Sequence, residues 1–221
     1  DALAVAMDTL GDGCNLLGFY MFHGGSNPMG KLTTMQESTD SGYPNDCPVM
    51  SYDFQAPIGE AGYCREFYYR LQTIFQFLQA YGKVLAPMIP VYPDCRPKDL
   101  EDTDTLRCCI RSDGESAFLF VNNHHHGKLL PEHRDVTFKI AFAEETLDIS
   151  CPFIPADVTF LIPVRMKLGE MLLAYAFAQP VSFTEKEYYF EEVEGMEPLF
   201  CFGDGRKLVI RGTAAIGDIT I

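Results

Sequence analysis

Five carboxylates in the first third of the chain could take part in acid–base or nucleophilic chemistry: Glu37, Asp40, Asp46, Asp53 and Glu60. Two such groups about 5–5.5 Å apart can cleave a glycosidic bond with retention, one as acid/base and the other as nucleophile. The first three lie in a polar loop, where solvated acids are the usual finding. Glu60 opens a predicted helix, where its charge suits the helix dipole, and Asp53 could orient a neighbour. The sequence therefore offers no convincing catalytic pair.

Three consecutive histidines, in the string Asn122-Asn-His-His-His126, invite an interpretation as metal ligands. Adjacent residues on an extended backbone point to opposite faces, so three in a row seldom converge on one ion. Spaced ligand patterns such as HExxH do not accompany them. We interpret this segment as a polar turn after a strand at 118–121, and we predict no metal site.

The sequence contains no motif for a serine nucleophile or a phosphate-binding loop. Ser38 and Ser51 lack the glycine pattern of a nucleophile elbow. The Gly11-Asp-Gly13 sequence is too short and misplaced to cradle a phosphate. The chain has no Trp, so a sugar-binding surface would have to use its 11 Tyr and 17 Phe. We predict no cofactor.

The charge balance restricts the classes of partner. Lys and Arg total 17 against 31 Asp and Glu, which gives a net charge of −14 over 221 residues. Nucleic acids and anionic membrane surfaces are therefore poor partners, because they require a basic surface. The longest apolar runs are far shorter than a membrane span. A neutral ligand such as a sugar is compatible with this charge but is not selected by it.

Eight cysteines are scattered along the chain without a CxxC pair. An even count permits disulfides, which remain an alternative, but adjacent Cys108 and Cys109 suit no ordinary disulfide framework. In a chain of this length, scattered cysteines are more often reduced core residues. The pattern favours a reducing compartment such as the cytoplasm.

The elements that must position these residues begin with a segment of α/β type. Residues 2–10 are predicted to form the end of a helix, which the glycines at 11–13 terminate. The apolar run at 15–22 is typical of a strand buried on both faces. A long polar loop follows to about residue 50, then a short extended piece at 51–54. The next helix begins after Glu60 and presents one apolar face. The residues of that face are Phe67, Leu71, Ile74, Phe75 and Leu78.

A proline-rich linker separates this segment from a region with strand patterns. Predicted strands at 107–111 and 117–122 flank a hairpin turn, and alternating residues over 136–142 indicate a half-buried strand. Further strands are predicted at 158–164, 171–176 and 187–191, with a last hairpin over 200–210. This succession is typical of an antiparallel sandwich.

Two strings in the first segment resemble signatures of the retaining β-galactosidases of glycoside hydrolase family 35. The string NLLGFYMFHGGSN at 15–27 is similar to a family strand that ends in Tyr-Met-Phe-x-Gly-Gly-Thr/Ser-Asn. The string SYDFQAPIGEAG at 51–62 is similar to the family's Ser-Tyr-Asp-Tyr-Asp-Ala-Pro-x-x-Glu-x-Gly. They occur in the family's order with a loop of suitable length between them. That loop, at 30–46, resembles a bacterial branch of the family.

The resemblance implies a fold and a domain order. The expected fold class is α/β plus all-β: terminal β/α units of a TIM barrel followed by an antiparallel, sandwich-like β-domain. A complete barrel needs about 250 residues, so the chain could hold only its end. The expected parts are a C-terminal portion of the catalytic barrel at 1–88, the linker at 89–104 and the β-domain at 105–221. Residues 207–221 could open a further domain.

The resemblance also implies an activity and a set of site residues. Family members hydrolyse terminal β-galactosides with two glutamates, and neither glutamate string occurs here, so no catalytic residue is expected in this chain. The implied substrate-binding residues are Tyr20, Tyr52 and Phe54, with His23 and Asn27 as further candidates at the strand end. Much of the family has a tyrosine where this chain has Phe54, which removes one possible hydrogen bond to the sugar.

Two functional hypotheses follow. The first is a fragment of a β-galactosidase that supplies part of the sugar pocket wall and is inactive alone. The alternative is a non-catalytic carbohydrate-binding or structural module. Because a lone barrel piece would expose apolar surface, residues 1–88 are expected to pack on the β-domain, to self-associate or to be partly disordered. The linkage and aglycone of the substrate are left open.

Overall fold

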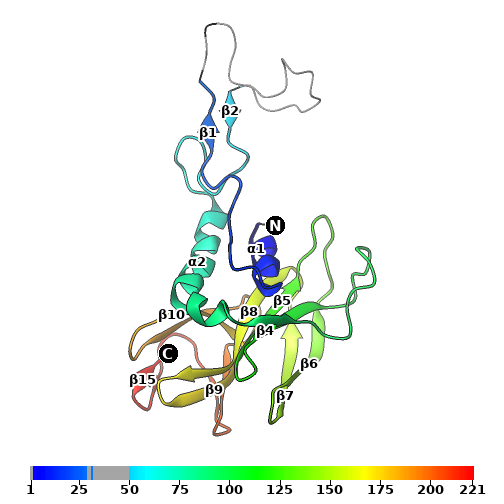
Figure 1. Cartoon of the computed structure of the whole chain (residues 1–221), viewed down its shortest axis with the longest axis vertical. Helices are drawn as coiled ribbons and strands as arrows, with labels where there is room; N and C mark the ends of the chain where they lie inside the picture. Colours follow the sequence, from blue (N-terminus) through cyan, green and yellow to red (C-terminus); the bar gives the residue numbers. More distant parts are fainter. Residues whose placement is uncertain (1, 29–30, 32–49) are drawn as a thin grey trace. The chain divides into compact units, whose positions relative to one another are not determined.

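The computed structural model describes residues 2–28, Lys31 and residues 50–221, which form two compact units (Figure 1). The larger unit combines residues 1–17 with 73–221, and the smaller unit comprises residues 18–72. Helix α1 spans Ala2–Gly11. Helix α2 spans Glu66–Leu85, beginning in the smaller unit and ending in the larger. Neither of these helices, within the described residues, is long and apolar enough to cross a membrane.

The larger unit is built on an antiparallel sheet of seven strands in the order β13-β12-β9-β8-β5-β4-β3. In chain order these are β3 (Ile89–Val91), β4 (Arg107–Ser112), β5 (Ala117–Asn123), β8 (Val158–Leu168), β9 (Met171–Ala176), β12 (Leu199–Phe202) and β13 (Lys207–Val209). Three separate hairpins are β6 (His133–Ala141) with β7 (Thr146–Ile154), β10 (Ala178–Phe183) with β11 (Tyr188–Glu192), and β14 (Ala215–Ile216) with β15 (Ile219–Thr220).

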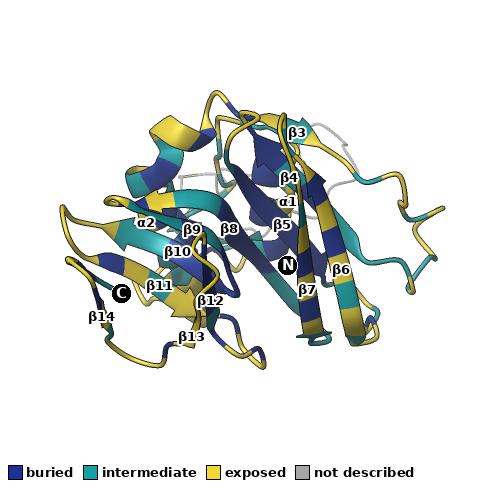
Figure 2. Ribbon diagram, turned by 90° about the horizontal axis from the view of Figure 1, so that it is seen from below, coloured by how far each residue is buried: buried dark blue, intermediate teal, exposed yellow. Residues whose placement is uncertain are grey.

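One face of the sheet is covered by the β6–β7 hairpin. Phe138 and Ile140 of β6 are buried in a cluster with Leu119 of β5 and Ile162 of β8, whereas the intervening Lys139 is exposed. The alternation is visible as bands of buried and exposed residues along β6 (Figure 2). Period-two patterning therefore gives this hairpin one core face and one solvent face.

The opposite face of the sheet packs against helices. Phe118 of β5 contacts the rings of Phe77 and Tyr81 on α2, with centroid distances of 5.1 and 6.1 Å. Gly11 at the end of α1 lies so close to the sheet that a Cβ there would be 3.2 Å from Phe120. Every residue of β5 is buried as a result, which explains why this strand is a continuous apolar run rather than an alternating one.

Arg111 of β4 joins three segments of the larger unit. Its side chain is 1% exposed, and its guanidinium donates to the Met88 carbonyl at 2.9 Å and to the Leu10 carbonyl at 3.3 Å. It also donates to Oδ1 of Asn15 at 2.9 Å. Because a buried guanidinium requires acceptors, these bonds fix the end of α1 and the segment after α2 against the sheet.

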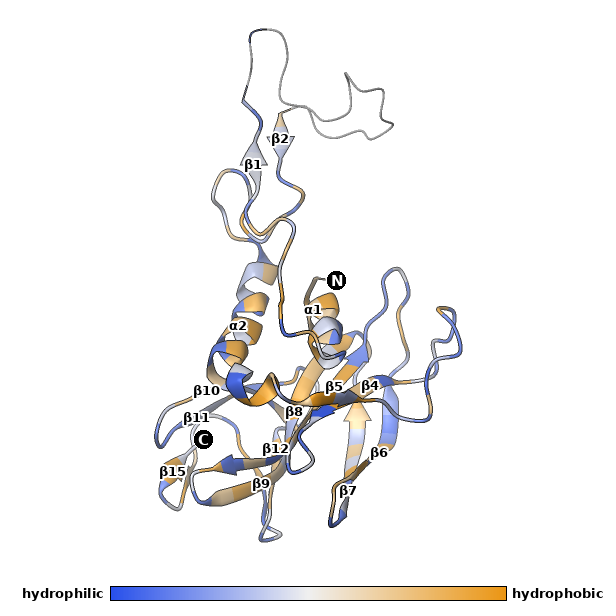
Figure 3. Ribbon diagram, viewed as in Figure 1, coloured by the Kyte–Doolittle hydropathy of each residue, from blue (hydrophilic) through white to orange (hydrophobic). Residues whose placement is uncertain are grey.

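The smaller unit contains little regular structure. Its strands are β1 (Gly25–Ser26) and β2 (Ser51–Tyr52), which pair antiparallel, and single bridges join His23 to Ile58 and Ile58 to Cys64. The first turns of α2 complete the unit. Hydrophobic and hydrophilic residues alternate around this helix (Figure 3), as expected for a helix with one packed face.

The predicted fold class is wrong where it places the end of a TIM barrel in this chain. The described residues form two helices and are otherwise mostly β-strands in several sheets, without the repeated strand–helix alternation of a barrel. The apolar run at 15–22 forms no strand, and its Leu16 is 86% exposed. A strand buried on both faces needs neighbouring strands to bond it, and the described residues supply none beside this run.

Several element predictions are confirmed. The strands predicted at 107–111, 117–122, 136–142 and 171–176 correspond to β4, β5, β6 and β9, and the last hairpin to β12–β13. On α2, Leu71 and Ile74 are buried as predicted, but Phe77 and Tyr81 take the places expected for Phe75 and Leu78. The domain boundaries expected at 88 and 104 stay a prediction.

Candidate functional site

The two signature strings meet in the smaller unit. Gly25 of β1 pairs with Tyr52 of β2, and the Asn27 amide donates to the Met50 carbonyl at 2.7 Å. A further hydrogen bond joins the two strings: the Gly24 amide donates to the Ile58 carbonyl at 2.7 Å. Residues some thirty positions apart are thereby brought side by side.

Three of the predicted site residues form one aromatic cluster, Tyr20, Tyr52 and Phe54. The hydroxyls of Tyr20 and Tyr52 are 3.0 Å apart and share a hydrogen bond. The Phe54 ring lies edge-on to that of Tyr52, with a centroid distance of 4.6 Å, and 6.4 Å from that of Tyr20. Tyr20 is 83% exposed and Phe54 48% exposed, so the cluster presents ring faces and hydroxyls to solvent.

A tight turn positions Phe54. The Ala56 amide donates to the Asp53 carbonyl at 2.9 Å, and both central residues, Phe54 and Gln55, have positive φ angles of 48° and 53°. Two left-handed residues in succession are the geometry of a type I′ turn, which usually takes Asn or Gly at these positions. The conformation must therefore be maintained by interactions around the turn.

Asp53 and Arg65 supply those interactions. The Asp53 carboxylate accepts from the Glu60 amide at 2.7 Å and from Arg65 at 2.5 Å. Arg65 also donates to the Ala56 carbonyl and to the Tyr63 hydroxyl, and its guanidinium lies over the Tyr63 ring. The backbone hydrogen bond from Glu60, followed by Arg65, lowers the pKa of Asp53. Asp53 therefore acts as a structural acceptor and not as an acid.

The other candidate carboxylates do not complete a pair within the described residues. Glu60 accepts a hydrogen bond from the Ser26 hydroxyl at 3.1 Å, which ties it to β1. Glu37, Asp40 and Asp46 lie outside the residues that the structure describes, as does almost all of the loop that resembles a bacterial branch.

His23 and Asn27 make backbone contacts apart from the aromatic cluster. The Nδ1 atom of His23 lies against the carbonyl of Gly24, and Asn27 bonds to Met50 through its amide. Sequence reasoning missed Arg65. The sequence shows only that Arg65 is the first basic residue after Asp53, which does not by itself assign it as the partner.

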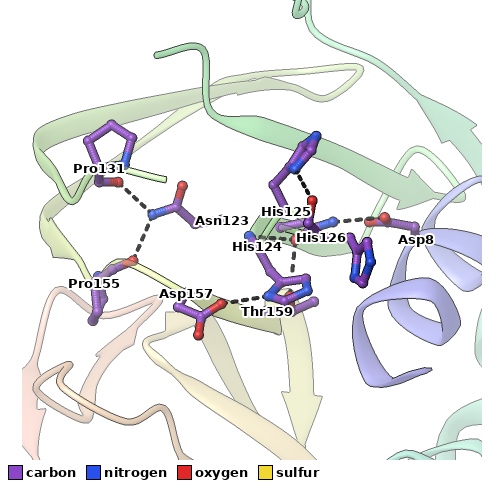
Figure 4. A network of polar contacts seen from close by, with 10 residues as sticks. Asp8, Asn123, His124, His125, His126, Pro131, Pro155, Asp157 and Thr159 are labelled. Atoms are coloured by element: carbon purple, nitrogen blue, oxygen red, sulfur yellow. Dashed lines mark hydrogen bonds and ion pairs between the residues drawn. The ribbon is translucent and has the colours of Figure 1, made fainter. Parts of the chain in front are cut away.

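The histidine run belongs to a structural network in the larger unit (Figure 4). His124 Nδ1 lies 2.5 Å from Asp157 Oδ1, and His125 Nδ1 bonds to the His126 carbonyl at 2.8 Å. Asn123 donates to the carbonyls of Pro131 and Pro155, so it joins two loops. The described residues contain no group of three His, Cys, Asp or Glu that could hold a metal ion.

The cysteines that the structure describes all carry free thiols. Burial raises the pKa of three of them, Cys108 and Cys151 to about 11 and Cys109 to about 12. A buried thiol with a raised pKa is protonated at neutral pH and is a poor nucleophile. These three cysteines act as core residues.

Comparison with known proteins finds a partial similarity to a human protein. No family model matches the chain. The chain is 40% identical over 81 residues to human Beta-galactosidase-1-like protein 3. The match covers 35% of this chain and 12% of that protein, so the chain spans only a small part of the relative's length. It indicates a β-galactosidase-like relationship, without singling out glycoside hydrolase family 35.

Proposed function

We propose that this chain is part of a β-galactosidase-like glycoside hydrolase, of the kind found in glycoside hydrolase family 35. The parent protein would hydrolyse terminal β-galactosides with retention. This chain contributes Tyr20, Tyr52 and Phe54 to the wall of the sugar site, and the two catalytic glutamates come from outside it. The partial similarity to human Beta-galactosidase-1-like protein 3 supports the assignment.

The observation that carries the proposal is the hydrogen bond between the Tyr20 and Tyr52 hydroxyls. It joins the two strings that resemble the family signatures and presents two hydroxyls beside the exposed ring of Phe54. A sugar offers hydroxyls to such donors and acceptors and its C–H face to an aromatic ring. The cluster has the chemistry to bind one galactosyl unit but no group to cleave it.

The chain alone is therefore expected to be inactive. Retaining hydrolysis requires two carboxylates about 5–5.5 Å apart, one of them able to donate a proton. Near the cluster, the hydrogen bonds from the Glu60 amide and Arg65 keep Asp53 ionised, so it is not the group that donates the proton.

The test compares hydrolysis of nitrophenyl β-galactoside by this chain and by the same chain extended upstream in its reading frame. The extended form is expected to be active and this chain inactive. Turnover by the pure short chain would refute the absence of catalytic groups. Inactivity of an extended form that carries both glutamates would refute the assignment to β-galactoside hydrolysis.

The second candidate function is a non-catalytic carbohydrate-binding or structural module. It is favoured by the engagement of Asp53 and Glu60 in structural hydrogen bonds beside an exposed aromatic cluster. A galactose titration, monitored through the NMR ring resonances of Tyr20 and Tyr52, distinguishes a carbohydrate-binding module from a structural one. Saturable shifts support binding, and unchanged resonances support a purely structural role.

A further inference from the structure

The carboxylate of Asp53 connects the aromatic cluster to the loop that follows it. Asp53 directly precedes Phe54, and its carboxylate accepts from the Glu60 amide and from the side chain of Arg65. Gly24 of the first string lies against this carboxylate. A Cβ at Gly24 would be 2.8 Å from Asp53 Oδ1 and 2.8 Å from the Glu60 nitrogen. Only glycine permits so close an approach, so position 24 leaves the space that the carboxylate occupies.

Arg65 bonds to both ends of the turn that carries Phe54. Its Nη2 donates to the Asp53 carboxylate at the first position of the turn, and its Nη1 donates to the Ala56 carbonyl at the last, each at 2.5 Å. Between them, Phe54 and Gln55 have the positive φ angles that side chains with a Cβ rarely adopt. Because a guanidinium presents its donors in a rigid fork, it holds two acceptors at a set separation. Arg65 therefore fixes the turn in its left-handed conformation.

The loop at 57–65 holds Arg65 itself in place. The Gly59 amide donates to the Tyr63 carbonyl at 2.8 Å. The Arg65 amide donates to the Pro57 carbonyl at 2.9 Å, which closes the loop at its base. The Tyr63 ring lies on Gly59, where a Cβ would overlap it, and the Arg65 guanidinium lies 4.8 Å from the centroid of the same ring. The guanidinium is thus presented to the turn by a loop with its own internal contacts.

Phe54 depends on this network, whereas the two tyrosine hydroxyls have separate support. Tyr52 pairs with Gly25 in the β1–β2 ladder, and its hydroxyl bonds to that of Tyr20. The Phe54 ring is half exposed and lies 4.6 Å from that of Tyr52, so the turn sets which face the ring offers to a ligand. Loss of the Arg65 side chain should therefore displace Phe54 and leave the pair of hydroxyls in place.

We propose that Arg65 is a positioning residue of the sugar site, which acts through Asp53 and the turn to hold the Phe54 ring beside Tyr52. This role rests on the proposed function, because it requires that the aromatic cluster bind the sugar. Arg65 acts on the sugar only through Phe54, since both of its Nη atoms bond to protein groups. Phe54 contacts the apolar face of the sugar in the ground state and in the transition state alike, so Arg65 affects affinity rather than the chemical step.

The test measures KM and kcat for nitrophenyl β-galactoside in the upstream-extended chain. Arg65→Met is expected to raise KM about fivefold or more and to leave kcat within about twofold, because a contact made equally in both states is lost. Arg65→Lys should give an intermediate KM, since a single ammonium restores a charge beside Asp53 but not the fork that bonds both ends of the turn. Arg70→Met, at an exposed arginine of the same unit, is the matched control and should keep both constants.

Gly24→Ala tests the same network from the other string while Arg65 stays intact. Its new Cβ would press on the Asp53 carboxylate and on the Glu60 amide, so KM should rise as it does in Arg65→Met. Gly18→Ala is the control for this change, because a Cβ at Gly18 would meet open space. Its kinetic constants should equal those of the unmodified protein.

The possible outcomes separate this role from the proposed function. If the unmodified extended chain hydrolyses the substrate but Arg65→Met and Gly24→Ala keep its KM, the positioning role is wrong and the proposed function stands. A fall in kcat with unchanged KM in these variants would also overturn the role, since it would mean only that less of the protein is folded. An inactive extended chain that carries both glutamates would refute the proposed function and, with it, this role of Arg65.

Discussion

Different interactions stabilise each of the two units of the chain. In the larger unit, a seven-stranded sheet is covered by a hairpin on one face and by helices on the other, and β5 is buried along its whole length. In the smaller unit, a two-residue strand pair and the hydrogen bonds of Arg65 hold loops whose aromatic residues are largely exposed. Stability thus resides mainly in one unit, and the candidate sugar-binding surface lies in the other.

An arginine joins distant segments in each unit, and the two differ in burial. Arg111 is buried and bonds to main-chain carbonyls, whereas Arg65 remains partly exposed and pairs with a carboxylate. Buried polar groups are costly to leave without partners, whereas exposed ion pairs contribute little. The comparison therefore predicts large effects from changes in the larger unit and small ones in the smaller.

The largest loss of stability is expected from Phe77→Ala. Phe77 is fully buried between α2 and the sheet, so its truncation leaves a cavity and should cost about 3–5 kcal/mol. Chemical denaturation measures the loss. Val84→Ala, on an exposed position of the same helix, is the control and should change stability by about 0.5 kcal/mol or less. Equal effects would mean that α2 is not packed on the sheet.

Arg111→Met should have the next largest effect. The change removes the guanidinium that donates to the Met88 carbonyl and to Oδ1 of Asn15 in a buried site, at a cost of about 1–3 kcal/mol. Urea unfolding of Arg111→Met and of the exposed control Arg211→Met gives the comparison. A loss no larger than that of the control would contradict a structural role for Arg111.

As the pH falls, the smaller unit should lose stability at a higher pH than the seven-stranded sheet of the larger unit. Hydrogen bonds lower the pKa of Asp53 from its ordinary value of about 3.9, so its contribution is complete above that pH and is lost as the pH falls through the folded-state pKa. The hydrogen-exchange protection factors of residues 53–63, which correct for the intrinsic pH dependence of exchange, should therefore fall below about pH 4. In Arg65→Met this pH dependence should weaken, and an unchanged profile in the variant would show that Arg65 does not support the carboxylate.

The smallest effect on stability is expected at Phe54. Its ring is half exposed, so Phe54→Ala should cost no more than about 1 kcal/mol. Because its φ angle is 48°, Phe54→Gly should be at least as stable as Phe54→Ala, since glycine adopts this region without steric cost. The melting temperatures of the two variants, compared in thermal unfolding, test this order of stability. A markedly less stable glycine variant would contradict the left-handed turn.

The sequence predicted the larger unit better than the smaller. Alternation over 136–142 and the turn at Asp113-Gly114 carry local signals, so β6 and the β4–β5 hairpin were accessible without tertiary information. The run at 15–22 shows the limit, because an apolar segment predicts burial only if neighbours are present to cover it. Leu16, at the start of this run in the larger unit, and Tyr20, further along it in the smaller unit, are both largely exposed for that reason.

The candidate site was predictable in part. The signature strings pointed to Tyr20, Tyr52 and Phe54, which the structure brings into one cluster. They did not point to Arg65, because the partner of Asp53 is set by the folded path of the turn.

We propose that the aromatic cluster of Tyr20, Tyr52 and Phe54 binds the sugar of a β-galactoside. The most direct test measures kcat/KM for nitrophenyl β-galactoside in the upstream-extended chain and in its Tyr20→Phe and Tyr69→Phe variants. Tyr69 is an exposed tyrosine of α2 outside the cluster and serves as the control. We expect Tyr20→Phe to lower kcat/KM about tenfold or more while Tyr69→Phe leaves it unchanged. Equal kcat/KM values in both variants would contradict the claim.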